Sequence, residues 1–272
     1  MASQTKVREM IAKNNAKKGG LSDKIVPIIL AIISAISILT TIAILFTLLT
    51  ETITFFTRVP LSKFFLSGTW NPTGSSPEFG IWALIIGTLK ITVIATIVAV
   101  PIGLGAAIYL NEYASDRSRR IIKPILEILA GIPTIVFGFF ALTFVTPILR
   151  NLIPNLGEFN SISPGIVVGI MIVPMITSMS EDAMSSVPDK IREGAFGLGA
   201  TKFEVATKVV LPAATSGVVA SIVLGISRAI GETMIVSLAA GSSPTSSLSL
   251  TRSIQTMTGY IVEIATGDAA FG

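Results

Sequence analysis

Residues 193–212 read Glu-Gly-Ala-Phe-Gly-Leu-Gly-Ala-Thr-Lys-Phe-Glu-Val-Ala-Thr-Lys-Val-Val-Leu-Pro, a charged stretch between two apolar segments. The residues just before it predict the start of a helix, because Pro188 is suited to a first helical position and the acidic Asp189 follows in the first turn. Gly199 predicts the end of that helix, since glycine adopts the left-handed conformation at little cost. We name residues 185–212 the helical loop.

A second short helix follows directly. Thr201 and Glu204 form a Thr-x-x-Glu capping box ahead of a valine-rich stretch that Pro212 closes. The helical loop is therefore predicted to hold two short helices with a corner at Gly199. It is too polar to cross a bilayer, and a rigid polar element between two membrane spans is a docking surface for another molecule.

The composition is that of an integral membrane protein. Of the 272 residues, 51% are hydrophobic and 13% charged, about half the charge of a soluble domain, and the mean hydropathy is +0.78. We do not interpret the net charge of +4 as nucleic-acid binding, because the positive residues follow the membrane topology. The chain has no cysteine and no histidine, so it lacks thiolate ligands, the usual general base and the commonest metal ligand. We expect no catalytic residue, metal or cofactor.

Five apolar segments are long enough to cross about 30 Å of hydrocarbon. We expect an all-α, polytopic protein with spans at about 25–50, 81–110, 126–149, 164–184 and 213–241. The second would measure about 45 Å as a straight helix, so it must tilt, protrude or break, and Pro101, Gly103 and Gly105 mark the predicted break. Pro133, Gly138 and Pro174 mark similar irregularities in the third and fourth spans.

The positive residues set the orientation. Residues 1–24, 111–127 and 185–212 together hold fourteen Lys and Arg, whereas the alternate loops hold four. We therefore expect the basic segment 1–24 and the helical loop to be cytosolic, with a transmembrane domain at 25–241 and an extracytoplasmic segment at 242–272.

Two charges lie near the middle of the last span, where an unpaired charge is rare. Arg228 and Glu232 are spaced i, i+4, which on a continuous helix would allow an ion pair. One interpretation is a structural pair; the other is that both residues line or gate a water-filled pathway, where Arg228 would contact an anion. Lys90 is expected to reach the membrane interface, and Glu181 to be solvated or paired with Arg192.

On the same segment, small residues recur every four positions. Gly217, Ser221, Gly225 and Ala229 allow a neighbouring helix to approach closely, as do Gly165 and Gly169 in the fourth span. We interpret both sets as packing devices.

The helical loop also resembles a known pattern. Membrane subunits of ATP-binding-cassette importers carry Glu-Ala-Ala, then Gly, then Ile-x-Leu-Pro at fixed spacing. The residues that fall on it are Glu193, Ala195, Gly199, Val209, Leu211 and Pro212. Gly194 and Val209 are mild departures from the consensus.

Further stretches resemble the permease subunits of the phosphate importer. Arg228-Ala229-Ile230-Gly231-Glu232-Thr233-Met234 and Gln255-Thr256-Met257-Thr258 are similar to the PstC-type subunit rather than to its PstA-type sister. The resemblance implies a type I importer (MetI-like) transmembrane fold with a sixth span, transport of inorganic phosphate, and roles for Arg228 and Glu232. The sixth span would follow Gly272, so we expect the given sequence to end before it.

The resemblance also implies partners. These are a PstA-type sister permease, an ATP-binding-cassette ATPase dimer seated on the helical loop, and an extracytoplasmic phosphate-binding protein, all at a prokaryotic inner membrane. No phosphate-binding Gly-x-x-x-x-Gly-Lys-Ser/Thr loop occurs in the sequence, so ATP hydrolysis would belong to a separate chain. The alternatives are a permease for another oxyanion, such as sulfate or molybdate, and a membrane scaffold or sensor without substrate flux. A membrane enzyme is disfavoured, because the only mid-bilayer acid has an arginine as its expected partner.

Overall fold

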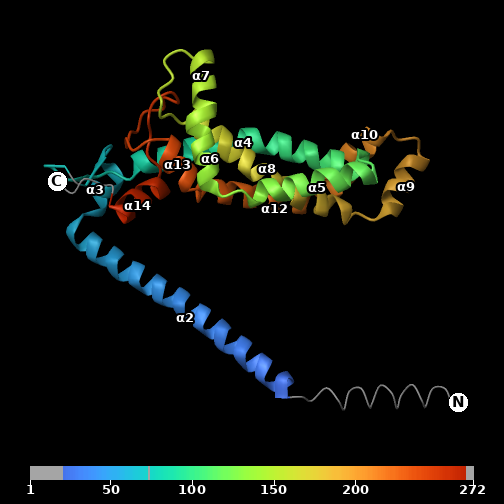
Figure 1. Ribbon diagram of the computed structural model, residues 1–272, viewed down its shortest axis with the longest axis horizontal. Helices are drawn as coiled ribbons and strands as arrows, with labels where there is room; N and C mark the ends of the chain where they lie inside the picture. The colour runs from blue at the N-terminus through green and yellow to red at the C-terminus, as the bar shows by residue number, and fades with distance from the viewer. Residues whose placement is uncertain (1–20, 73, 268–272) are drawn as a thin grey trace. The chain divides into compact units, whose positions relative to one another are not determined.

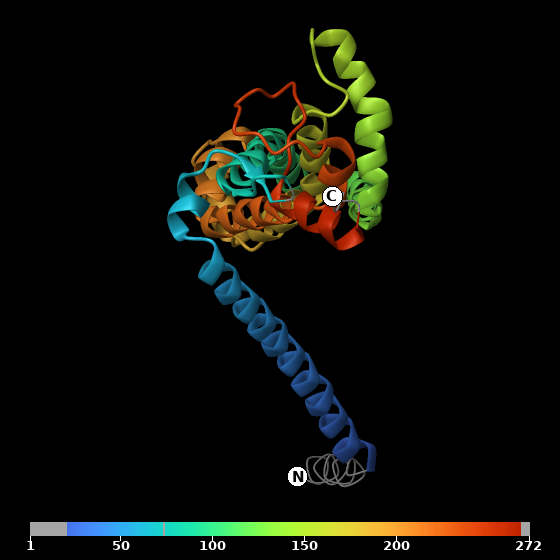
Figure 2. The same ribbon diagram turned by 90° about the vertical axis from the view of Figure 1, so that its left-hand side faces the viewer.

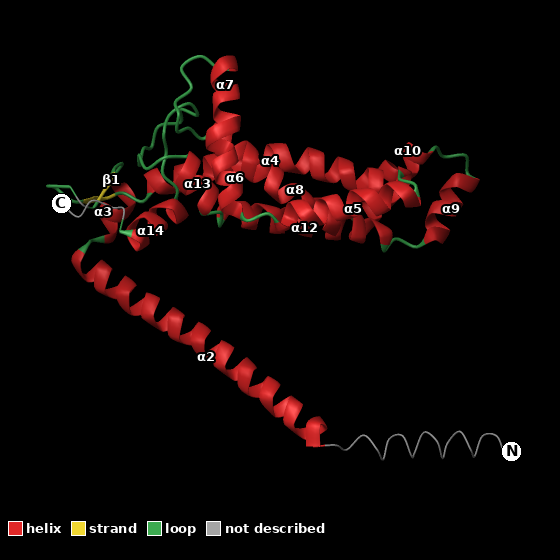
Figure 3. Cartoon of the chain, in the orientation of Figure 1, coloured by secondary structure: helices red, strands yellow, loops and turns green. Residues whose placement is uncertain are grey.

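The computed structural model of the protein describes residues 21–72 and 74–267, and these are mostly helical, with loops between the helices (Figure 3). Most of the basic segment 1–24 and the last five residues of the segment 242–272 lie outside the described residues. The all-α class predicted from the sequence is confirmed. The exception to it is a hairpin of two very short strands, β1 (Trp70–Asn71) and β2 (Glu78–Phe79).

Helix α2 (Leu21–Arg58) forms a unit by itself. It contains the first predicted span and continues eight residues beyond Thr50. Every side chain from Ile25 to Thr54 is exposed, and most of these side chains are apolar. A helix that is apolar on all sides is suited to lipid rather than to water.

The second span is helix α4 (Trp82–Ile108), which continues as a π-helical turn, η1 (Tyr109–Tyr113). The predicted break near Pro101 is wrong, because the helix runs through this proline and through Gly103 and Gly105. Gly103 serves packing instead, since a Cβ there would lie 2.9 Å from Ile176 Cγ2. The irregular turn comes at the end of the span, in η1.

The third predicted span is divided at Pro133. An amphipathic helix, α5 (Asp116–Gly131), precedes it and buries none of its residues. After Ile132 and Pro133 the chain resumes as α6 (Thr134–Phe140), η2 (Ala141–Val145) and α7 (Thr146–Leu152). The apolar span therefore begins at Thr134 rather than at residue 126. Figure 1 shows α5 alongside α4 and α8, whereas α7 stands across them.

Helix α8 (Ile162–Ser185) is the centre of the bundle, seen end-on in Figure 2. Gly165 faces Ile94 and Gly169 faces Val98, so α4 and α8 run in the same direction. A Cβ at Gly169 would lie 2.8 Å from Val98 Cβ, which confirms the predicted packing role of these glycines.

Helix α12 (Thr215–Ile230) packs against α8 in the opposite direction. Its small residues face α8: Gly217 meets Ala183, Gly225 meets Ile176, and the Ser221 and Ser180 hydroxyls lie 2.6 Å apart. The small-residue stripe predicted for this helix is confirmed as a packing surface. Because each glycine of α12 leaves room for a side chain of α8, the two helices are held closely together.

The fifth predicted span is not one continuous helix. Helix α12 ends at Ile230, Gly231–Thr233 are not helical, and α13 (Met234–Ala239) follows. At its other end, α12 is bent by 76° from the helical stretch Lys202–Ala213. Among the described residues, four stretches are long and apolar enough to cross a membrane, and this bent pair is a fifth candidate. The four are Ile25–Arg58, Trp82–Tyr113, Thr134–Leu152 and Ile162–Ser185.

Two hydrophobic clusters hold together the helical bundle that follows α2. The larger joins α4, α6, α8 and α13 through residues such as Ile91, Ile172 and Ile235. The smaller lies where the helical loop meets the ends of α4 and α8, around Met184, Val205 and Val210. The opposite end of the bundle carries α3 (Leu61–Leu66), the β1–β2 hairpin and α14 (Met257–Thr266).

Candidate functional site

The corner of the helical loop forms as predicted. Helix α9 (Asp189–Gly197) is followed by Gly199 with φ of +84°, the left-handed conformation that favours glycine. The Gly199 N–H donates to the Phe196 carbonyl (2.9 Å), and the Ala200 N–H donates to the Ala195 carbonyl (3.1 Å). These two hydrogen bonds define a Schellman motif, which fixes the direction in which the chain leaves the helix.

The predicted capping box is also present. The second helical piece comprises α10 (Lys202–Glu204), the π-helical η3 (Val205–Val210) and α11 (Leu211–Ala213). The Glu204 N–H donates to Thr201 Oγ1 (3.3 Å), and the Thr201 N–H donates to Glu204 Oε2 (3.1 Å). This backbone hydrogen bond from Thr201, with the nearby Lys208 ammonium, lowers the pKa of Glu204 from 4.5 to about 2.

The six residues that match the importer pattern divide into two groups. Ala195, Val209 and Leu211 are half-buried and pack on the smaller hydrophobic cluster. The other three are exposed: Glu193, Gly199 and Pro212. The first group therefore attaches the loop to the bundle, and the second group is available to a partner.

Sequence reasoning missed three apolar side chains on the outside of the loop. Phe196, Leu198 and Phe203 are 42%, 91% and 66% exposed. Beside them, a hollow of about 330 Å³ is lined by Leu198, Gly199, Ala200, Glu204, Lys208 and Val209. The signal in the sequence was an apolar residue on either side of the glycine corner within an otherwise polar stretch. Apolar groups this exposed mark an interaction surface.

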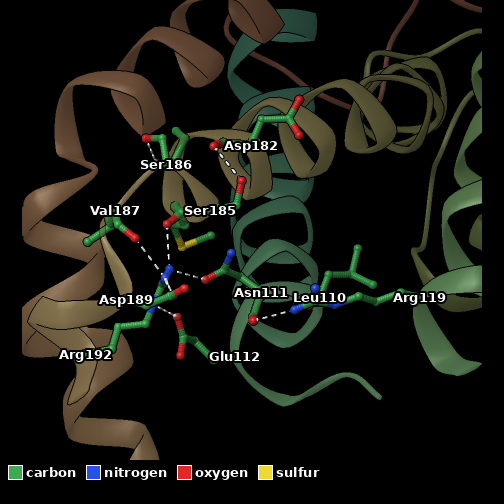
Figure 4. A network of polar contacts seen from close by, with 12 residues as sticks. Leu110, Asn111, Glu112, Arg119, Asp182, Ser185, Ser186, Val187, Asp189 and Arg192 are labelled. Atoms are coloured by element: carbon green, nitrogen blue, oxygen red, sulfur yellow. Dashed lines mark hydrogen bonds and ion pairs between the residues drawn. The ribbon is translucent and has the colours of Figure 1, made fainter. Parts of the chain in front are cut away.

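Arg192 fixes the start of the helical loop to the bundle (Figure 4). Its guanidinium donates to Glu112 Oε1 (3.3 Å) and Asn111 Oδ1 (3.1 Å) of η1, and to Asp189 Oδ1 (2.9 Å). It also donates to the Met184 and Val187 carbonyls at the end of α8 (2.7 and 2.9 Å). The Arg192 side chain is 13% exposed and that of Glu112 7%. One buried arginine thus joins α9, α8 and η1.

The η1 turn receives a second arginine from α5. Arg119 donates from Nε to the Leu110 carbonyl (2.8 Å) and from Nη2 to the Asn111 carbonyl (2.7 Å). The ends of α4, α5, α8 and α9 therefore meet at η1. The predicted partner of Glu181 is wrong, because Arg192 pairs with Glu112 and Asp189 while Glu181 pairs with Lys123.

Arg228 and Glu232 do not form the predicted ion pair, although the structure describes both residues. The reason is the break after Ile230, which removes the i, i+4 geometry that a continuous helix would give. Glu232 is 8% exposed and accepts a hydrogen bond from the Ile235 N–H (3.3 Å), so it caps α13. Its own carbonyl accepts from Thr258 Oγ1 (2.7 Å) of α14.

Arg228 faces a cavity of about 240 Å³ between α5, α8 and α12, which we name the α5–α8 cavity. Its charged lining residues are Lys123 and Glu127 from α5, Glu181 from α8, and Arg228. Lys123 Nζ lies 2.7 Å from Glu181 Oε2. The Glu181 side chain is 5% exposed and that of Lys123 is 44% exposed. The cavity brings together one predicted residue, Arg228, with three charges that the sequence did not connect to it.

Lys90 of α4 contacts the segment that follows α13. It is 8% exposed, and its ammonium donates to the Ser249 carbonyl (3.0 Å) and to the Ser247 carbonyl. Because both acceptors lie in the segment after α13, Lys90 holds that segment against α4.

With this geometry in place, the comparison with known families is informative. The family described as "binding-protein-dependent transport system inner membrane component" matches residues 99–271. The chain belongs to this family. It is a multi-pass inner-membrane protein with the helical fold of these transport components, and the helical loop and the α5–α8 cavity both lie within the matched residues.

Individual relatives in the binding-protein-dependent transport family agree with the predicted resemblance to PstC-type permeases. A probable ABC transporter permease protein of Bacillus subtilis, YqgH, is 38% identical over 180 residues, 66% of this chain and 58% of that protein. The phosphate transport system permease protein PstC of Haemophilus influenzae is 37% identical over 200 residues, 66% of this chain and 63% of that protein. The chain thus matches about three fifths of the length of these relatives. Among solved structures, an amino acid ABC transporter has a TM-score of 0.47 at 21% identity over 68% of this chain and 84% of that one.

Proposed function

We propose that this chain is the permease subunit of an ATP-driven importer that moves inorganic phosphate into the cytoplasm. The observation that carries the proposal is the match to PstC proteins, whose names give phosphate transport, over two thirds of this chain. In this proposal the subunit performs no covalent chemistry. ATP is hydrolysed by a separate ATPase dimer, a PstA-type permease completes the membrane unit, and an extracytoplasmic binding protein delivers phosphate.

The helical loop is the proposed seat of the ATPase. Phe196, Leu198 and Phe203 would supply the apolar contact, and the exposed Glu193 a charged one. The Schellman corner and the capping box make the loop rigid, which a lever requires. Movement of the ATPase would then reach the spans as a rigid-body displacement, the usual form of such switching.

The proposed orientation places residues 1–24 and the helical loop in the cytosol and residues 242–272 outside. The cysteine-free sequence allows a direct test with single cysteines at exposed positions. A membrane-impermeant thiol reagent added to intact cells should label Ser243→Cys and should not label Lys202→Cys until the membrane is permeabilised. The opposite pattern would reverse the orientation.

The function is tested by reconstitution. The chain is incorporated into proteoliposomes with its sister permease, the ATPase and the binding protein, and uptake of labelled phosphate is measured with and without ATP. We expect ATP-dependent uptake that excess sulfate or molybdate does not compete away. Uptake of one of those oxyanions instead would assign a different substrate. Recovery of an assembly that hydrolyses no ATP in response to binding protein would favour the scaffold or sensor.

A further inference from the structure

The α5–α8 cavity contains two cations at different depths. Helix α8 lines it with Met171, Pro174, Met175, Ser178 and Glu181, which share one face of the helix. Since α12 runs antiparallel to α8, with Ser221 at Ser180 and Gly225 at Ile176, Arg228 lies near the level of residue 173. Lys123 is fixed at the level of Glu181 by its ion pair. Eight helical residues separate the two levels, about 12 Å along α8.

The two cations have different surroundings. The Arg228 guanidinium forms no hydrogen bond or ion pair with any residue in the described ranges 21–72 and 74–267, and a free guanidinium can bind an oxyanion through two parallel hydrogen bonds. Lys123 has a counter-ion, Glu181. The carboxylate is fixed in a buried position on the bundle, whereas the ammonium is on a half-exposed, flexible side chain. In this pair, lysine is therefore the partner that can move.

The charge of the cavity suits passage rather than retention. Lys123 and Arg228 are balanced by Glu127 and Glu181, so the lining has no net charge. A pathway must bind its ion strongly enough to admit it and weakly enough to release it. A neutral lining with one free cation and one exchangeable cation meets both conditions.

We propose that Arg228 and Lys123 are successive contacts for the phosphate anion in the α5–α8 cavity, and that Glu181 is the counter-ion that Lys123 exchanges for the anion. This inference rests on the proposed function. Arg228 would receive the anion at the deeper level, and Lys123 would leave Glu181 to bind it on the side of the helical loop. When phosphate departs, the Lys123–Glu181 pair forms again.

The alternative is a purely structural role, in which the Lys123–Glu181 ion pair only attaches α5 to α8. In the proposal the Lys123 ammonium binds the anion, whereas in the structural role it binds only Glu181. The absence of cysteine from the sequence allows the two roles to be distinguished. In the double variant Lys123→Cys/Glu181→Gln both charges are removed together, so no unpaired buried carboxylate remains. The thiol can then be converted to an ammonium with 2-aminoethyl methanethiosulfonate, or to an uncharged disulfide with methyl methanethiosulfonate.

We expect phosphate uptake by the reconstituted double variant to fall at least about tenfold, the loss of one charged hydrogen bond. The ammonium reagent should restore most of it although Glu181 is absent, and the uncharged reagent should not. Arg120→Cys/Glu181→Gln is the matched control, because Arg120 is an exposed cation of α5 outside the cavity lining. Neither reagent should change uptake by this control or by the unsubstituted assembly.

Wild-type uptake by the untreated double variant, or equal rescue by both reagents, would overturn the exchange and leave the proposed function standing. Absence of phosphate uptake by the unsubstituted assembly would instead refute the proposed function. Assembly is checked by co-purification of the ATPase. If the double variant does not assemble, the single variant Lys123→Cys decides: phosphate should slow its reaction with the ammonium reagent, and an unchanged rate at saturating phosphate would overturn the proposal.

Discussion

Replacing Arg192 by methionine tests whether one side chain attaches the helical loop to the spans. Methionine keeps much of the apolar stem and removes all five donor contacts, to the side chains of Glu112, Asn111 and Asp189 and to the carbonyls of Met184 and Val187. The Glu112 side chain, 7% exposed, is then buried without its cation. Removing one partner of a buried ion pair costs about 3–5 kcal/mol. We therefore expect the docked α9 to become less favoured by about two to four powers of ten.

Hydrogen–deuterium exchange of the purified assembly measures this directly. Amides of residues 189–197 should exchange faster in Arg192→Met by a factor of that order. In proteoliposomes, ATP hydrolysis should continue while phosphate moved per ATP falls. Lys190→Met is the control, since Lys190 is exposed on the same helix and forms no ion pair within the described residues. The double variant Arg192→Met/Glu112→Gln removes the stranded charge and should recover part of the lost protection. Exchange in Arg192→Met that equals that of Lys190→Met would refute the reasoning.

Four further predictions concern separate parts of the chain. Gly199→Pro requires φ near −65° where the structure has +84°, and it removes the N–H that is hydrogen-bonded to the Phe196 carbonyl. The amount of ATPase that co-purifies with the subunit should fall in Gly199→Pro and in Glu193→Lys, while both variants still insert into the membrane. Undiminished co-purification would contradict the docking surface. Arg228→Ala should abolish phosphate uptake with assembly intact, and wild-type uptake would reduce Arg228 to a structural role. The pKa of Glu204 is about 2, below its ordinary value of 4.5, so the ionised carboxylate stabilises the capping box fully above about pH 4.5, and this stabilisation is lost as the pH falls toward 2. Amide exchange of residues 202–210, corrected for intrinsic rates, should become faster over this pH range in the wild type and not in Glu204→Gln. Lys90→Met should increase exchange of residues 245–250 by about tenfold or more, since two charged hydrogen bonds are lost, and unchanged protection would show that Lys90 does not hold that segment.

The helical loop could be predicted in detail from the sequence because its signals are local. A glycine that ends a helix and a Thr-x-x-Glu box act within a few residues, and both form the expected hydrogen bonds. The exposure of Phe196, Leu198 and Phe203 could not be predicted from the sequence. Which apolar side chains of a short helix are buried depends on how the loop sits on Met184 and Val187, which are distant in the sequence from Val205 and Val210.

The spans could be predicted as apolar segments, but their breaks could not. Pro101 lies inside a continuous helix, whereas Pro133 separates α5 from α6. Both prolines stand in apolar stretches, and a membrane helix tolerates a proline when its surroundings satisfy the freed carbonyl. The break at Gly231–Thr233 has the same cause: it is stabilised by the Glu232 cap and by Thr258, a contact across 26 residues. That non-local contact is why the Arg228–Glu232 pair was predicted wrongly. Lys123–Glu181 was not foreseen because it joins two different helices, α5 and α8, whose pairing the sequence does not reveal.

The packing also indicates where this unit can open. Helices α4, α8 and α12 approach through Gly103, Gly169 and Gly225, each with a neighbouring side chain in the place that a Cβ would take, so they cannot slide past one another without separating. Helix α5 buries no residue. Arg119 attaches its first turn to η1, and beyond Gly131 the chain is not helical until Thr134. Between these ends α5 contacts the bundle through the Lys123–Glu181 ion pair and through Leu129, which packs against the larger hydrophobic cluster. A displacement of the helical loop, transmitted through Arg192 to η1, would therefore move α4, α8 and α12 together and be taken up at α5, the wall of the cavity that contains Arg228.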